Sequence, residues 1–106
     1  MYTYRVPVSE DEHQQLLTLC KDKHLKRSSM MRMLLTEAVR EYRQECNGRL
    51  SISLKYADFE RFNYEQIYVP AEIHDFFCEL SKAAGGLTET QLVRQFLIPK
   101  LMDKGR

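Results

Sequence analysis

The chain has 106 residues, a net charge of +1, 43% hydrophobic residues and 29% charged residues. This length and composition are typical of a globular protein with one core, and they exclude the disordered and fibrous classes. The sequence has no apolar run long enough to span a bilayer and no hydrophobic signal segment at its start, so we expect a cytoplasmic protein. We expect residues 1–106 to form a single compact domain.

Residues 2–42 are predicted to form a strand followed by two helices. Apolar and polar side chains alternate over residues 2–8, as they do in a half-buried strand. Ser9 and Glu12 have the spacing of a capping box, which predicts a helix over about residues 10–23. A second helix is predicted to begin near Arg27, and its apolar face has three- and four-residue spacing. That face consists of Met30, Met31, Leu34, Leu35, Ala38 and Val39.

Residues 65–102 repeat this pattern of strand, helix, helix. A short alternating segment predicts the strand, and the helix after it should end at Gly85, because glycine readily adopts the left-handed cap conformation. Thr88 and Gln91 form a second capping box that opens the last helix. We expect Pro99 to kink or end that helix, because proline removes a helical hydrogen bond and clashes with the preceding turn.

Residues 43–64 separate the two units as an insert. Alternation over residues 50–56 predicts a further strand, with Ser51, Ser53 and Lys55 on its polar side. Either this segment or residues 65–69 could pair with the first strand, and the sequence leaves both arrangements open.

The two units align with each other in order. Val6-Pro7 matches Val69-Pro70 if the first unit carries two extra residues between strand and helix, and the second helices match at an offset of 62 residues. The strands end in Arg-Val-Pro or Tyr-Val-Pro, and the second helices open with Lys-Arg-Ser-Ser or Thr-Glu-Thr-Gln, each with an arginine soon after. With these features, residues 2–42 and 65–102 resemble the ribbon-helix-helix superfamily of DNA-binding proteins, the MetJ and Arc type.

The resemblance implies an α+β fold that is mostly helical. In that family two chains interlock, and their strands pair into an antiparallel two-stranded ribbon. Two units in one chain imply a tandem pseudo-dimer around one core. A lone strand with two short helices also leaves its apolar faces exposed and the backbone groups of the strand without hydrogen-bond partners. Each unit therefore needs the other.

The expected partner is double-stranded DNA, with the ribbon in the major groove. Outward positions of the two strands would read base edges, namely Thr3, Arg5, Gln66 and Tyr68. Arg5 suits guanine, and Gln66 suits adenine. The alternative is that these four residues are merely the solvated face of a sheet.

By resemblance, the start of each second helix would bind a DNA phosphate. The expected phosphate-binding residues are Lys21, Lys23, Lys26, Arg27, Ser28, Ser29, Thr88 and Thr90. Glu89 stands where the first unit has Arg27 and would repel phosphate, so we expect the two halves to bind DNA unequally. The unlike outward residues of the two strands imply a DNA target without perfect two-fold symmetry. Self-association or a protein partner on the same DNA is also expected, because one ribbon reads only a few base pairs.

The cysteines Cys20, Cys46 and Cys78 form no CxxC pair, and we expect His13, His24 and His74 to form no helical i, i+4 ligand pair with another histidine or cysteine. We therefore predict no metal and no cofactor. The sequence has no glycine-rich phosphate loop and no nucleophile elbow, so we do not expect an enzyme.

The expected role is that of a transcriptional repressor or of an accessory factor at a plasmid or phage DNA site. The main alternative is a protein-interaction module that keeps the fold but has lost DNA contact, which the near-neutral charge and the aromatic insert would allow. An antitoxin is a third alternative, although only about four residues follow Met102 to serve as a partner-binding tail.

Overall fold

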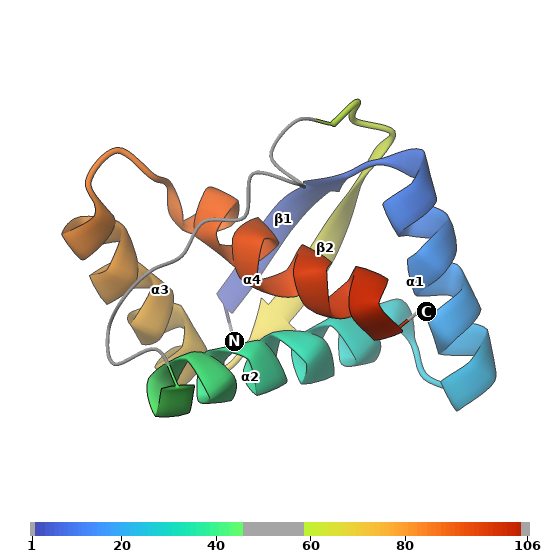
Figure 1. Ribbon diagram of the computed structural model, residues 1–106, viewed down its shortest axis with the longest axis horizontal. Helices are drawn as coiled ribbons and strands as arrows, with labels where there is room; N and C mark the ends of the chain where they lie inside the picture. Colours follow the sequence, from blue (N-terminus) through green and yellow to red (C-terminus); the bar gives the residue numbers. More distant parts are fainter. Residues whose placement is uncertain (1, 46–58, 105–106) are drawn as a thin grey trace.

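The computed structural model describes residues 2–45 and 59–104. The described elements are β1 (Tyr2–Val8), α1 (Glu10–Lys23), α2 (Arg27–Glu45), β2 (Asn63–Val69), α3 (Ala71–Ala84) and α4 (Glu89–Lys104), as Figure 1 shows. The predicted α+β, mostly helical class is confirmed. No helix in the described ranges is long and apolar enough to cross a membrane.

The two strands pair with each other as an antiparallel two-stranded sheet. Arg5 lies opposite Gln66 at the middle of the ribbon, and Thr3 lies opposite Tyr68. The predicted segment 65–69 is therefore the partner of β1, within a strand that begins two residues earlier, at Asn63. The strand predicted at residues 50–56 lies outside the described residues.

The elements of the two halves correspond almost residue by residue. The span 2–23, containing β1 and α1, recurs as 63–84, containing β2 and α3, at a constant displacement of 61 residues. The helices α2 and α4 begin at residues 27 and 89, a displacement of 62. Val69-Pro70 therefore corresponds to Val8-Ser9, and the predicted match with Val6-Pro7 is wrong. The two prolines differ in role, because Pro7 lies inside β1 while Pro70 is the N-cap of α3.

The core lies between the ribbon and the helices, and both halves contribute to it. Val6, Ile67 and Val69 on the inner face of the ribbon are fully buried. Helix α2 contacts β2, whereas α4 contacts β1 and α1, so each second helix packs against the strand of the other half. In Figure 1, α4 crosses the ribbon, and α2 runs past the end of β2. Neither half has a core of its own.

Helix α4 continues through Pro99 to Lys104, so of the two effects predicted for Pro99, a kink or an end of the helix, the end is wrong. Ile98 and Leu101, on either side of the proline, are 0% and 1% exposed. Burial of these side chains against the core stabilises the last turns more than the missing N–H of Pro99 destabilises them.

Candidate nucleic-acid interface

The four predicted base-reading residues lie together on the outer face of the ribbon. Thr3, Arg5, Gln66 and Tyr68 are all exposed, and the strand neighbours of Arg5, Gln66 and Tyr68 are buried, whereas Tyr2 beside Thr3 is exposed as well. The strand register places Thr3 opposite Tyr68 and Arg5 opposite Gln66, so the four side chains form one patch. Arg5 and Gln66 also occupy corresponding positions in the two halves, since they are 61 residues apart.

Two residues that the sequence analysis missed belong to the same face. Tyr64 lies on it, and the Arg5 guanidinium is 4.5 Å from the centre of the Tyr64 ring. Arg61 lies 4.9 Å from the same ring, and its Nη1 donates a hydrogen bond of 2.6 Å to the Tyr64 hydroxyl. Residues 64, 66 and 68 alternate along the strand and therefore share one face, which could have identified Tyr64. This signal was missed because the strand was predicted to begin at residue 65.

A surface hollow of about 420 Å³ connects this face to the start of α2. Arg27 and Ser28, two of the predicted phosphate-binding residues, line it. The remaining residues that line the hollow come from the two strands and are Arg5, Asn63, Tyr64, Glu65, Gln66 and Tyr68. The structure therefore brings together residues predicted for base reading and for phosphate binding from three separate segments. The Arg27 side chain is 49% exposed, and its Nη1 lies 3.4 Å from Glu65 Oε1.

The other predicted phosphate-binding residues of the first half are more dispersed. Lys21, Lys23 and Lys26 are exposed at the end of α1 and just before α2. His24 between them adopts the left-handed conformation, with φ 55°, which turns the chain from one helix into the next. Ser29 lines a different hollow, together with Arg32 and Arg40, so its side chain is separate from the hollow at the ribbon.

The start of α4 differs from the start of α2. Thr88 caps the helix, because its hydroxyl accepts a hydrogen bond of 3.1 Å from the Gln91 N–H. Gln91 Oε1 in turn accepts a bond of 2.9 Å from the Thr88 N–H, so the predicted capping box is confirmed. Because the Thr88 N–H already donates to Gln91, it is not available to donate to a phosphate. Thr90 is half-buried in the first turn.

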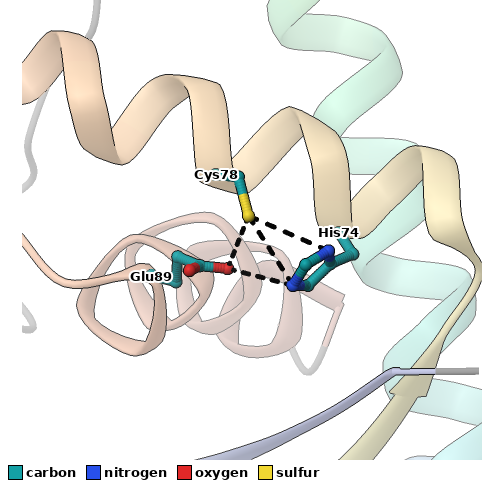
Figure 2. A group of neighbouring side chains, drawn as sticks. All are labelled: His74, Cys78 and Glu89. Carbon is teal, nitrogen blue, oxygen red and sulfur yellow. Dashed lines mark hydrogen bonds and ion pairs between the residues drawn. The ribbon is translucent and has the colours of Figure 1, made fainter.

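The Glu89 carboxylate is directed toward α3 and β1. The Tyr4 hydroxyl donates a hydrogen bond of 2.7 Å to Glu89 Oε1, and Cys78 and His74 lie beside it (Figure 2). Burial and the nearby Glu89 carboxylate raise the pKa of the Tyr4 hydroxyl, so Tyr4 acts as a neutral donor. The same two causes raise the pKa of the Cys78 thiol.

The corresponding position in the first half holds a different set of groups. His13 lies 61 residues before His74, and its Nδ1 is 2.8 Å from Oε1 of the buried Glu65. Arg27, which corresponds to Glu89, supplies a positive charge to the same carboxylate oxygen. This site thus joins a histidine and a guanidinium of the first half to the Glu65 carboxylate of β2, whereas the site at α3 joins a histidine, a thiol and a carboxylate that all belong to the second half.

The expectation that the histidines form no helical i, i+4 ligand pair is wrong, because His74 and Cys78 have this spacing and both side chains lie on one face of α3. Cys20 and His24 have the same spacing, but His24 lies beyond the end of α1. Within the described ranges, the one group of three or more neighbouring metal-ligand side chains consists of His74, Cys78 and Glu89. Cys46 lies outside those ranges.

Comparison with protein-family models, with curated proteins and with solved structures gave no match.

Proposed function

We propose that the protein binds double-stranded DNA in a sequence-specific manner by inserting the β1–β2 ribbon into the major groove. The proposal rests on one observation above all, the hollow that Arg5 and Gln66 share with Arg27 and Ser28. A DNA-binding ribbon needs base-reading side chains on its outer face and a phosphate contact at its margin, and this hollow supplies residues suited to both.

The chemistry of the ribbon fits this role. The major groove, about 12 Å wide, admits a two-stranded ribbon. A guanidinium such as that of Arg5 can bond guanine O6 and N7 together, and the amide of Gln66 can bond adenine N6 and N7. Free backbone N–H groups at the start of α2 favour a phosphate, and the first turn of α2 contains no acidic residue.

The packing supports a tandem ribbon-helix-helix pseudo-dimer. Each strand pairs with the other strand and is covered by the second helix of the other half. The start of each second helix also contacts the strand of the other half, since Glu89 of α4 accepts a bond from Tyr4 of β1 and Arg27 of α2 donates one to Glu65 of β2. The protein would act as a transcriptional repressor, or as an accessory factor that marks a plasmid or phage DNA site.

The test is selection of short duplexes from a random pool at two salt concentrations. Arg5→Ala should relax the selected motif at one position, a loss of about 1–3 kcal/mol for the preferred base. Arg27→Ala should weaken binding to all sequences and reduce the salt slope by about one. Arg40→Ala is the matched control, because Arg40 is an exposed arginine on α2 that lines the separate hollow. Failure to retain any duplex at low salt would overturn the proposal.

Exposed aromatic rings favour a second candidate, a protein-interaction module. Phe62, Tyr64 and Tyr68 are 53%, 37% and 43% exposed along one strand and its approach, and the net charge is only +1. Aromatic residues are enriched in protein interfaces. This candidate predicts that Tyr68→Ala abolishes capture of a protein partner while Arg5→Ala has little effect.

A further inference from the structure

We propose that His74, Cys78 and Glu89 bind one divalent transition-metal ion of the zinc type, joining α3 to the start of α4. The three ligands all come from the second half of the chain, and the inference holds whether or not the protein binds DNA. It rests on the spacing of the three ligand atoms, on the charges around them, and on the side chains that hold them in place.

The three ligand atoms form a triangle of the size that zinc requires. Cys78 Sγ lies 3.6 Å from His74 Nε2 and 3.4 Å from Glu89 Oε1, and these two atoms are 3.6 Å apart (Figure 2). Zinc binds nitrogen and oxygen at about 2.0–2.1 Å and sulfur at about 2.3 Å, so the edges of a tetrahedral site measure about 3.3–3.6 Å. The triangle thus matches one face of a tetrahedron, and a water or another group would complete it.

The choice of ligands selects the class of metal. One thiolate, one imidazole and one carboxylate suit zinc and its close analogue cobalt, whereas calcium and magnesium prefer oxygen ligands alone. All three side chains are half-buried, so the site is held within the fold and remains accessible to an ion from solvent.

The charges around the site also favour a cation. At the corresponding site, the guanidinium of Arg27 in the first half faces the carboxylate of Glu65 on β2. In the second half, Glu89 replaces that arginine, and Cys78 stands where the first half has Leu17, 61 residues earlier. Because Tyr4 stands where the other site has Glu65, the exchange keeps one carboxylate, removes the fixed positive charge and adds a thiol that binds metals as a thiolate. A divalent ion would supply the charge that Arg27 supplies in the first half.

Neighbouring side chains orient the ligands. The Tyr2 ring stacks on the His74 ring, with centroids 3.8 Å apart and planes 5° from parallel. The Tyr4 hydroxyl bonds Glu89 Oε1, and the Asp75 carboxylate lies 3.7 Å from His74 Nδ1, the ring nitrogen away from the proposed metal bond. Outer groups of this kind commonly fix the orientation of metal ligands.

Without a metal, the Cys78 thiol can donate its proton to the Glu89 carboxylate as a hydrogen bond. Metal binding would break this bond, form bonds from the metal to Sγ, Nε2 and Oε1, and release the thiol proton to solvent. No electron is transferred, since zinc undergoes no redox change.

The test uses the whole chain with Cys20→Ser and Cys46→Ser, which leaves Cys78 as the only cysteine of the three. Titration with cobalt(II) should produce a sulfur-to-cobalt charge-transfer band and the intense visible bands of a tetrahedral ion, at one equivalent of metal. Zinc should displace the cobalt and abolish these bands. Circular dichroism of each metal-free variant checks that its fold is retained.

Ligand variants in the same background make the assignment specific. Cys78→Ser should abolish the charge-transfer band, and His74→Ala and Glu89→Gln should each weaken cobalt binding at least about tenfold, since even outer groups contribute that much. His24→Ala is the matched control and should leave binding unchanged. The absence of the charge-transfer band from the single-cysteine protein would overturn the proposal. A cobalt affinity that neither His74→Ala nor Glu89→Gln alters would overturn it equally.

Discussion

At the residue scale, the buried ion pair between Arg94 and Glu12 links the two halves. Arg94 Nη1 and Nη2 donate to Glu12 Oε1 and Oε2 over 2.8 and 2.9 Å, and both side chains are about 5–6% exposed. Nη1 also donates to the Pro7 carbonyl, and the Phe59 ring covers the guanidinium at 3.5 Å. Glu12 in addition forms the predicted capping box with Ser9, which is confirmed.

Arg94→Ala should lower the free energy of unfolding by about 3–5 kcal/mol, because it leaves the Glu12 carboxylate buried without its partner. Urea denaturation would measure the change. Arg32→Ala is the matched control, since Arg32 occupies the corresponding position in α2 but is only half-buried, and we expect it to cost less than about 1 kcal/mol. Equal losses in the two variants would show that the buried pair has no special role.

Tyr64 and Arg5 should act together in reading DNA. The ring of Tyr64 lies beside the Arg5 guanidinium, so Tyr64→Ala should allow Arg5 to move and should relax the same base position as Arg5→Ala, to a smaller extent. A double-mutant cycle on the preferred duplex should give a coupling free energy of about 0.5–1 kcal/mol or more. Strictly additive losses would mean that the two side chains contact DNA independently.

At the element scale, the sequence predicted the identity of each described helix and strand, because turn residues and capping boxes are local signals. Ser9 with Glu12 and Thr88 with Gln91 both begin helices where predicted. The errors arose where packing at long range decides the outcome. The start of β2 at Asn63 depends on its pairing with Val8, and the continuation of α4 depends on burial of Leu101.

Pro99→Ala should stabilise the protein, because Pro99 lies inside α4 without an N–H to donate. We expect the free energy of unfolding to rise by about 1–3 kcal/mol, measured by urea denaturation. Pro70→Ala is the control, since Pro70 precedes α3 as its N-cap and its replacement should change stability little. A loss of stability in Pro99→Ala would show instead that the proline ring is needed for packing.

At the scale of the whole molecule, the two halves share one architecture but differ in the groups beside the ribbon. Their common element order was predictable from the repeat, whereas the contrast between Arg27 with Glu65 and Glu89 with Cys78 was not. It depends on the strand of one half lying beside the helices of the other, since Tyr4 of β1 contacts Glu89 of α4. Single-sequence reasoning identified the charge difference but not the group of ligands that accompanies it.

If both proposals hold, zinc should strengthen DNA binding through Glu89. The carboxylate at the start of α4 repels a phosphate, and a bound divalent ion would neutralise it while leaving the helix N–H groups in place. Zinc should therefore raise the affinity for the preferred duplex about two- to fivefold at low ionic strength, which corresponds to about 0.3–1 kcal/mol for a charge at a helix start. Fluorescence anisotropy of a labelled duplex, with and without zinc, would measure the gain.

Glu89→Gln should reproduce the gain without metal and should no longer respond to zinc, because the amide carries no charge and binds the ion poorly. An equal zinc response in the native and Glu89→Gln proteins would mean that the ion acts elsewhere, on the DNA or on another site, and would separate metal binding at α4 from recognition of the phosphate.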